Sequence, residues 1–135
     1  GRRELLPNKV IESINKAEKG TENYEDYVFT ICLAYGSREE IIQAIREIAS
    51  LHASGELSLE QIDEKEVSNR LYTRDVPDPD LIIRTSGEER ISNFLLWQSA
   101  YSEFIFVDTY WPSFSKREFL RALQTYQTRT RRFGE

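Results

Sequence analysis

Apolar residues along the chain follow two patterns: short unbroken runs, and longer stretches in which they recur every three or four positions. The unbroken runs are rich in β-branched and aromatic residues, which predicts buried strands at 27–34, 81–84 and 104–107. The stretches between them carry the spacing of amphipathic helices. Strands that alternate with helices indicate an α/β fold with a mostly parallel sheet flanked by helices.

Capping residues mark where the helices begin and end. A first helix is predicted over 5–19, and a second begins at a capping box formed by Ser37 and Glu40 and ends near 54–55. The apolar stripe of the second helix comprises Ile41, Ile45, Ile48 and Ala49. Three further capping pairs predict later helix starts: Ser58 with Gln61, Asp63 with Glu66, and Ser115 with Glu118. The core-facing residues of the last helix are predicted to be Phe119, Leu120, Leu123 and Tyr126.

About three strands are fewer than a typical sheet contains, about five to six, so the predicted sheet is incomplete.

The composition of the chain argues against several classes of function but does not indicate one. The net charge of −5 argues against nucleic-acid binding, which needs a basic face. No apolar run approaches about 18 residues, so no spanning helix is expected. The single cysteine, Cys32, lies in an apolar run and is predicted to be a buried thiol in a cytoplasmic protein, and His52 is predicted to be no metal ligand.

Candidate chemistry gathers after the run at 81–84. Arg84 ends this run, a turn with Gly87 follows, and Arg90 and Ser92 come next, before another apolar segment. The carboxyl ends of parallel strands are where ligands bind in open α/β sheets. Guanidinium groups match phosphate oxygens in pairs, and Ser92 as a helix N-cap would place free N–H groups beside them. These residues predict a site for a phosphate-rich ligand.

The same arginines have a second interpretation. Arg84 and Arg90 would then form a solvated ion network with Glu88, Glu89 or Asp80, without any ligand. The composition of the loop alone leaves the two interpretations equally open.

Three motifs resemble one family. They are 84–114 (RTSGEERISNFLLWQSAYSEFIFVDTYWPSF), 34–38 (AYGSR) and 129–134 (RTRRFG). The first is similar to the C-terminal signature of the cis-prenyltransferases, which include the undecaprenyl and dehydrodolichyl diphosphate synthases. The resemblance implies that residues 1–135 are the C-terminal part of a single catalytic domain of that fold, without the N-terminal part that carries its first motif.

The resemblance implies an activity and its cofactor. Members of the family condense isopentenyl diphosphate with an allylic prenyl diphosphate to form Z-polyprenyl diphosphates, and they use Mg²⁺. By motif, Arg84, Arg90 and Ser92 would bind the diphosphate of isopentenyl diphosphate, and Glu103 would help bind Mg²⁺, a cation that prefers oxygen ligands. The alternative for Glu103 is a solvent-exposed carboxylate at a strand edge.

Further site residues are implied elsewhere. Arg38 corresponds to a residue near the allylic diphosphate, and its alternative is a first-turn helix residue that pairs with Glu39 or Asp26. Arg132 and Gly134 match an R-x-G motif that relatives deliver across a dimer interface. The alternative for these two is a frayed tail, and the basic residues from Arg129 onward also complement a helix C-terminus.

The resemblance also implies what the chain lacks. No stretch like D-G-N-G-R, the family's first motif, occurs in the sequence, so no catalytic residue is assigned here and the chain alone is expected to be inactive. A homodimer, or a complex with the missing N-terminal half, is implied, as is peripheral membrane contact through the lipid product. Two alternatives remain: a non-catalytic partner subunit of such an enzyme, and a diphosphate-binding module without chemistry.

Overall fold

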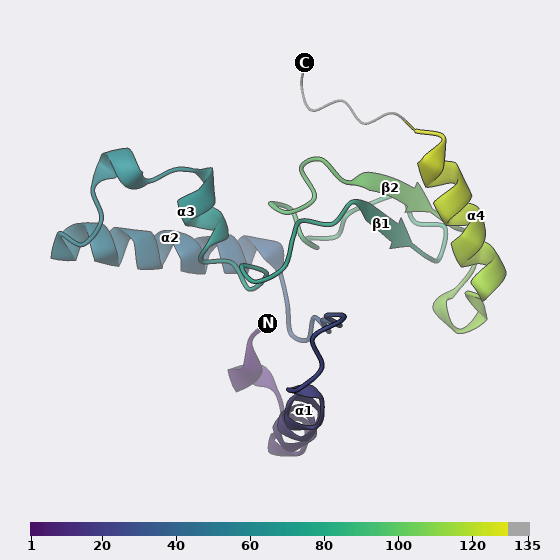
Figure 1. Cartoon of the computed structure of the whole chain (residues 1–135), viewed down its shortest axis with the longest axis horizontal. Coiled ribbons are helices and arrows are strands. Elements are labelled where there is room, and N and C mark those ends of the chain that lie inside the picture. Colours follow the sequence, from purple (N-terminus) through teal and green to yellow (C-terminus); the bar gives the residue numbers. More distant parts are fainter. Residues whose placement is uncertain (130–135) are drawn as a thin grey trace. The chain divides into compact units, whose positions relative to one another are not determined.

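The computed structural model describes residues 1–129, and the chain divides into two compact units, Gly1–Val76 and Pro77–Glu135 (Figure 1). The first unit is helical and holds, with η for a 3₁₀ turn, η1 Arg3–Leu5, α1 Asn8–Thr21, α2 Ser37–Ser54, η2 Leu59–Gln61 and α3 Glu64–Ser68. The second unit holds β1 Leu81–Arg84, β2 Glu103–Phe106, η3 Trp111–Ser113 and α4 Lys116–Gln127. The strands are parallel, which confirms an α/β fold with a small, partial parallel sheet and flanking helices.

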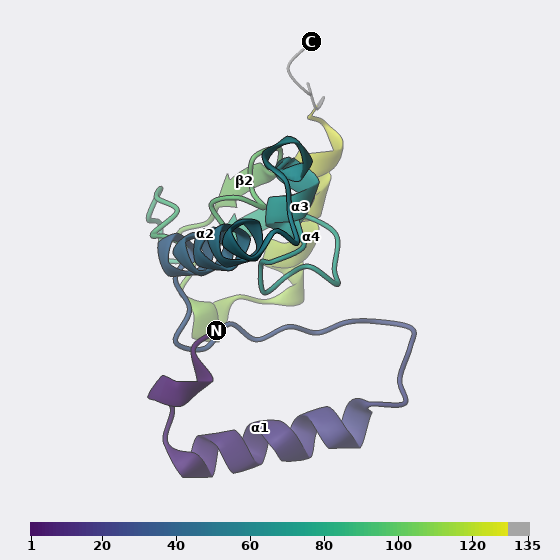
Figure 2. The same cartoon turned by 90° about the vertical axis from the view of Figure 1, so that its left-hand side faces the viewer.

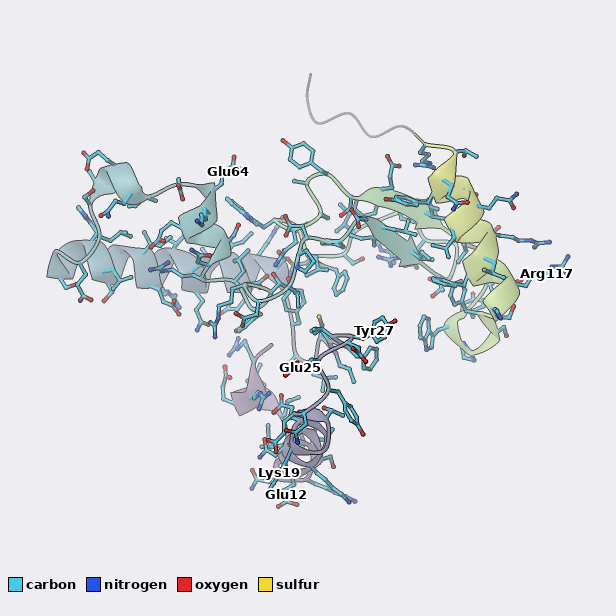
Figure 3. The ribbon with its side chains drawn as sticks, in the orientation of Figure 1. Glu12, Lys19, Glu25, Tyr27, Glu64 and Arg117 are labelled. Carbon is cyan, nitrogen blue, oxygen red and sulfur yellow. The ribbon has the colours of Figure 1, made fainter. Side chains whose placement is uncertain are left out.

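Helix α1 begins later and ends later than predicted. Pro7 is its N-cap, and the helix continues through Gly20 to Thr21. Proline lacks an N–H, so the chain before it cannot continue the helical hydrogen bonds, and Arg3–Leu5 forms a separate 3₁₀ turn instead. Glu12 and Lys19 project from the outer side of α1 (Figure 3).

The strand predicted at 27–34 is wrong for this structure. The segment is extended and runs back along α1 (Figure 2), but it belongs to no sheet, because the sheet within residues 1–129 consists of β1 and β2. An extended segment without a partner leaves its N–H and C=O groups to solvent. Its side chains are exposed accordingly, Tyr27 to 92% and Phe29 to 88%. A cleft of about 670 Å³ separates the segment from α1.

Cys32 is correspondingly only half-buried rather than buried, and it is a free thiol. Partial burial still raises the pKa of this thiol above its ordinary value, since desolvation disfavours the thiolate.

Helix α2 ends where predicted and begins differently. Gly55 adopts a left-handed φ of 79°, and its N–H donates to the carbonyl of His52, a terminus that glycine favours. The predicted capping box at its start is wrong, because Gly36 is the N-cap and Ser37 is the first helical residue. Glu40 is buried and instead accepts from the Tyr35 hydroxyl at 2.6 Å and from the N–H of Tyr72 at 2.7 Å.

The apolar stripe of α2 is buried only in part. Ile48 is 7% exposed, as predicted, but Ile45 is 51% exposed and Ala49 is exposed too. Ala44 takes the innermost position, and Leu57 and Leu71 complete the core of the first unit.

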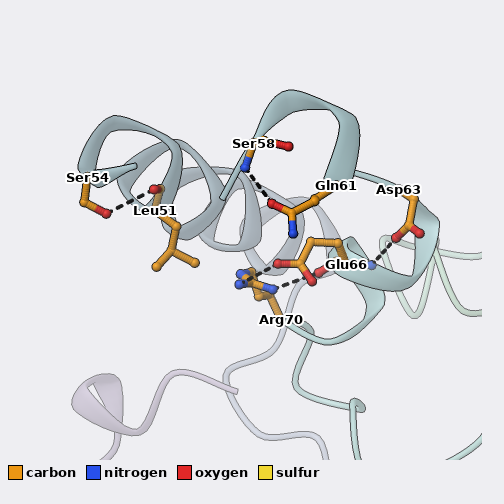
Figure 4. A network of polar contacts seen from close by, with 7 residues as sticks. All are labelled: Leu51, Ser54, Ser58, Gln61, Asp63, Glu66 and Arg70. Atoms are coloured by element: carbon orange, nitrogen blue, oxygen red, sulfur yellow. Dashed lines mark hydrogen bonds and ion pairs between the residues drawn. The ribbon is translucent and has the colours of Figure 1, made fainter. Parts of the chain in front are cut away.

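Local capping was predicted correctly after α2. Ser58 and Gln61 form a capping box, and the side chain of Asp63 accepts from the N–H of Glu66 at 2.7 Å (Figure 4). Glu66 in turn forms an ion pair with Arg70 at 2.8 Å, across one helical turn. The two capping contacts join residues three positions apart, which is why the spacing predicted them.

The second unit is organised by its parallel pair. Leu81 is opposite Glu103, and Arg84 is opposite Phe106, so β2 begins one residue earlier than predicted. The N–H of Val107 nevertheless donates to the carbonyl of Arg84 at 2.9 Å, which extends the pairing by one hydrogen bond. Ile105 is buried in this sheet.

The helix expected to open at Ser92 is not formed. Ser92, Asn93 and Leu95 have positive φ values of 52°, 63° and 47°, and residues 92–101 form turns. A right-handed helix cannot contain such left-handed residues in succession, so Ser92 is not a helix N-cap.

Helix α4 starts at the predicted capping box of Ser115 and Glu118. Its buried residue is Ala122, whereas Phe119 and Leu120, predicted to face the core, are 43% and 52% exposed. No helix within residues 1–129 has the length and apolar character needed to cross a membrane.

Candidate functional site

The turn after β1 is held against the segment that follows β2. The N–H of Ser86 donates to the carbonyl of Thr109 at 3.0 Å, and the N–H of Gly87 donates to the carbonyl of Val107 at 2.9 Å. Gly87 has a φ of 69°, and a Cβ there would lie 3.0 Å from the Oδ1 of Asp108. Glycine therefore allows both the left-handed turn and the close approach.

Arg84 is the centre of a polar cluster at this end of the sheet. Its guanidinium donates to the Oγ of Ser92 at 2.8 Å, to the Oε2 of Glu88 at 2.7 Å and to the carbonyl of Arg90. Arg90 forms an ion pair with the same carboxylate oxygen of Glu88. The three residues predicted to bind a diphosphate are thus brought together.

The cluster also contains an ion network of the kind that the alternative, ligand-free interpretation predicted. Arg84 and Arg90 share the carboxylate of Glu88 in this network. The hydrogen bond from Arg90, and after it the one from Arg84, hold the pKa of Glu88 below its ordinary value. Arg84 is 25% exposed and Arg90 is 62% exposed, so an anion from solvent can reach both guanidiniums.

A cleft of about 260 Å³ opens beside the cluster. Arg84, Arg90 and Ser92 line one part of it, and Phe94 is among its apolar lining residues. Phe104 and Phe106 line it too, their rings stacked with centroids 6.2 Å apart. Alternate residues of a strand share one face, so both rings project from the same side of β2. Guanidiniums beside aromatic rings suit a small anion that carries an apolar group.

Glu103 lies at the opposite end of the parallel pair. It is the first residue of β2, level with Leu81, and Arg84 is three residues farther along β1. At about 3.3 Å per residue, the backbones at these two positions are about 10 Å apart along the sheet. The side chain of Glu103 pairs with Arg129 at 2.8 Å and is 20% exposed, so it is not the free surface carboxylate of the alternative interpretation.

A complete metal site is not formed by the described residues: within 1–129 no three His, Cys, Asp or Glu side chains gather closely enough to hold an ion. Glu103, the residue that the resemblance implies as a metal ligand, is a single carboxylate. Mg²⁺ in phosphate-binding sites is commonly held by one or two carboxylates together with phosphate oxygens and water, so a single carboxylate fits part of such a site.

The other implied residues lie elsewhere. Arg38 is an exposed residue in the first turn of α2, within the first unit. Arg132 and Gly134 lie outside the described residues. The Nδ1 of His52 donates a hydrogen bond to the carbonyl of Leu57 at 2.9 Å, which is a structural contact.

Sequence reasoning missed the role of Arg129. Its position after the last helix predicted only a favourable interaction with the helix C-terminus, whereas the structure pairs it with a residue 26 positions earlier. The spacing of neighbouring residues cannot indicate a contact between residues that are so far apart in the sequence.

Comparison with known proteins gives consistent matches. The family model described as "Putative undecaprenyl diphosphate synthase" matches residues 1–134. The chain is 54% identical over 134 residues to a tritrans,polycis-undecaprenyl-diphosphate synthase (geranylgeranyl-diphosphate specific) of Methanopyrus kandleri, covering 99% of this chain and 49% of the relative. A relative with the same name from Thermoplasma volcanium is 54% identical over 130 residues, 96% of this chain and 50% of its own length. The chain thus spans about half the length of these curated relatives.

Two solved structures of related enzymes are similar to this chain in both sequence and fold. Lavandulyl diphosphate synthase from Lavandula x intermedia, crystallised with dimethylallyl diphosphate, is 38% identical with a TM-score of 0.96, over 100% of this chain and 58% of that one. A probable undecaprenyl diphosphate synthase from Campylobacter jejuni is 33% identical with a TM-score of 0.84, over 100% of this chain and 61% of that one.

Proposed function

Since the chain belongs to the undecaprenyl diphosphate synthase family of prenyltransferases, we propose that it is the C-terminal part of an enzyme that elongates polyprenyl diphosphates with Z double bonds. In each step the C–O bond of an allylic diphosphate breaks, a C–C bond forms to isopentenyl diphosphate, and the isopentenyl unit loses a proton. The charge that develops on the leaving diphosphate needs cations and hydrogen-bond donors around it.

The observation that carries this proposal is the convergence of Arg84, Arg90 and Ser92 on one cleft. Two guanidiniums and a hydroxyl provide donors for the diphosphate of isopentenyl diphosphate. Phe94 and the aromatic pair on β2 provide an apolar surface for its five-carbon group. The ion pairs of Glu88 with the two arginines do not involve the aromatic rings. The presence of these rings in the cleft therefore favours a ligand that carries an apolar group as well as a negative charge.

Glu88 has a defined part in this proposal. It pairs with both guanidiniums and keeps them oriented, which leaves the cluster with a net positive charge, and the diphosphate then replaces it. Prearranged side chains lose less conformational freedom when a ligand binds.

Glu103 is proposed to contribute an oxygen ligand to Mg²⁺, with the remaining ligands coming from diphosphate and from residues outside the chain. Mg²⁺ would neutralise diphosphate charge. Arg38 is proposed to act at the allylic diphosphate. Arg132 and Gly134 are proposed to reach the diphosphate site of the other subunit in a homodimer.

The allylic substrate is proposed to be geranylgeranyl diphosphate. The support is the name shared by the archaeal relatives, which are between 49% and 54% identical to this chain. Lavandulyl diphosphate synthase, at 38% identity, was crystallised with the shorter dimethylallyl diphosphate, so a shorter allylic substrate is the alternative to test beside it.

We propose that the chain is inactive by itself and works with an N-terminal region of the kind its relatives have. The exposed segment 27–34 supports this, because a run that is apolar on both faces is suited to the interior of a parallel sheet. Exposed aromatic residues in the second unit, Tyr110 at 71% and Trp111 at 74%, fit a dimer contact. The protein is proposed to be cytoplasmic, touching membranes through its lipid product.

The test uses a fusion of this chain to the N-terminal half of the Methanopyrus kandleri relative, hereafter the fused protein. Isopentenyl diphosphate is titrated into it calorimetrically. Because hydrogen bonds to charged groups are each worth about 1.5–3 kcal/mol, Arg84→Ala and Arg90→Ala should each weaken binding at least about tenfold. Arg117→Ala is the matched control, since Arg117 projects from α4 into solvent (Figure 3).

Undiminished binding in both variants would refute the diphosphate site and favour the non-catalytic partner subunit. Binding without any turnover in the fused protein would instead favour the diphosphate-binding module.

A further inference from the structure

The ion pair between Arg129 and Glu103 joins the end of the last helix to the start of the second strand. The Nη1 of Arg129 lies 2.8 Å from the Oε2 of Glu103. Arg129 directly follows Thr128, the C-cap of α4, and its N–H donates to the carbonyl of Tyr126 at 3.0 Å. Its backbone is therefore fixed by the helix, and the side chain reaches across to β2.

The ion pair is partly exposed, and its carboxylate is more buried than its guanidinium, because the Arg129 side chain is 46% exposed. The side chain of Glu103 is 20% exposed, and its N–H is bonded to the carbonyl of Asp80, so both the backbone and the side chain of Glu103 are held. Helix α4 also contacts β2 directly, with Ala122 buried. The guanidinium is thus the cation that satisfies this carboxylate in the structure.

The carboxylate of Glu103 carries one negative charge, which Arg129 already balances. Mg²⁺ binds oxygen at about 2.0–2.1 Å, and two cations at one oxygen repel each other. We infer that Arg129 and a divalent cation compete for Glu103, so that cation binding weakens the ion pair and frees the Arg129 side chain. The inference rests on the proposed Mg²⁺-binding role of Glu103.

Arg129 is accordingly a positioning residue, because its pairing with Glu103 sets how readily that carboxylate binds a cation.

The expected effect is modest, because partly exposed ion pairs are weak. Removing the competing guanidinium should tighten cation binding by about twofold to fivefold. Arg129→Lys keeps a cation but loses the planar fork, and should fall between the wild type and Arg129→Ala. Glu103→Gln removes the charge that attracts both cations and should weaken cation binding.

The first measurement is a calorimetric titration of the fused protein with MgCl₂ in the presence of isopentenyl diphosphate. If Glu103→Gln leaves Mg²⁺ affinity unchanged, the proposed metal role of Glu103 fails and the inference fails with it. If Glu103→Gln weakens binding but Arg129→Ala does not tighten it, the metal role stands and the competition is refuted.

The second measurement is limited digestion with trypsin, read by mass spectrometry. Trypsin must take up the Arg129 side chain to cut before Thr130, so the ion pair should protect this bond. Mg²⁺ should increase the cleavage rate after Arg129 in the wild type at least twofold, relative to cleavage after Arg117, and should have no such effect in Glu103→Gln. Equal rates with and without Mg²⁺ in the wild type would overturn the release of the Arg129 side chain.

Discussion

Single side chains decide the chemistry of the cleft, and Glu88 is the one whose role is easiest to isolate. It accepts from both Arg84 and Arg90, and this pairing lowers its pKa. Glu89 is the adjacent carboxylate, is exposed, and has no part in this pairing. The two neighbours therefore form a matched pair for experiments on the network.

The ion network should make stability depend on pH in the acid range. The pKa of Glu88 is lower in the folded state than its unfolded value of about 4.3. Its contribution is therefore present above that value and is lost as the pH falls through the folded pKa. The difference in Tm between wild type and Glu88→Gln, measured by scanning calorimetry, should be largest at neutral pH and should shrink as the pH is lowered below about 4. Glu89→Gln should show no such trend, and an equal trend in both variants would contradict the role of Glu88.

Gly87 offers a test of the turn that carries the cluster. Alanine there must adopt a φ of 69° with its Cβ 3.0 Å from Asp108. Gly87→Ala should therefore lower the free energy of unfolding of the fused protein by about 1–2 kcal/mol, measured by urea denaturation. Gly20→Ala is the control, because Gly20 is helical with no atom within 4 Å of an added Cβ, and alanine should stabilise α1 by about 0.5–1 kcal/mol. A neutral Gly87→Ala would show that the turn relaxes without strain.

Elements whose boundaries depend on nearby residues were predicted well, and those that depend on distant residues were not. The caps at Ser58, Asp63 and Ser115 were correct because each is satisfied within three residues. The cap at Ser37 failed because Glu40 is bonded to Tyr72, 32 residues away. The strand at 27–34 failed for the same kind of reason, since a strand exists only beside a partner.

The extended segment 27–34 should exchange its amide hydrogens at different rates in the isolated chain and in the fused protein. In the 135-residue chain the amide hydrogens of 27–34 should exchange quickly, because they have no strand to pair with. In the fused protein a paired strand should slow this exchange by at least about a hundredfold, as measured by hydrogen exchange and mass spectrometry. Amides in the middle of α2 are the internal control and should be protected in both. Equal exchange of 27–34 in the two proteins would contradict the proposed completion of the sheet.

At the scale of the whole molecule, the sequence indicated the family and the parallel strands but not the separation of the proposed site residues. Arg84, Arg90 and Ser92 are close in sequence and converge, as predicted. Glu103 is displaced from them because the register places it opposite Leu81, and register depends on how two strands pair rather than on the spacing within either. The distance of this proposed metal ligand from the arginine cluster is one more reason to expect that the working site includes residues outside this chain.

Incorporation of labelled isopentenyl diphosphate into polyprenyl product, with geranylgeranyl diphosphate and Mg²⁺ present, tests the central claim most directly. The fused protein should form product, the 135-residue chain alone should form none, and Arg84→Ala in the fused protein should lower the rate at least about tenfold. Product from the isolated chain, or an undiminished rate in Arg84→Ala, would contradict the account.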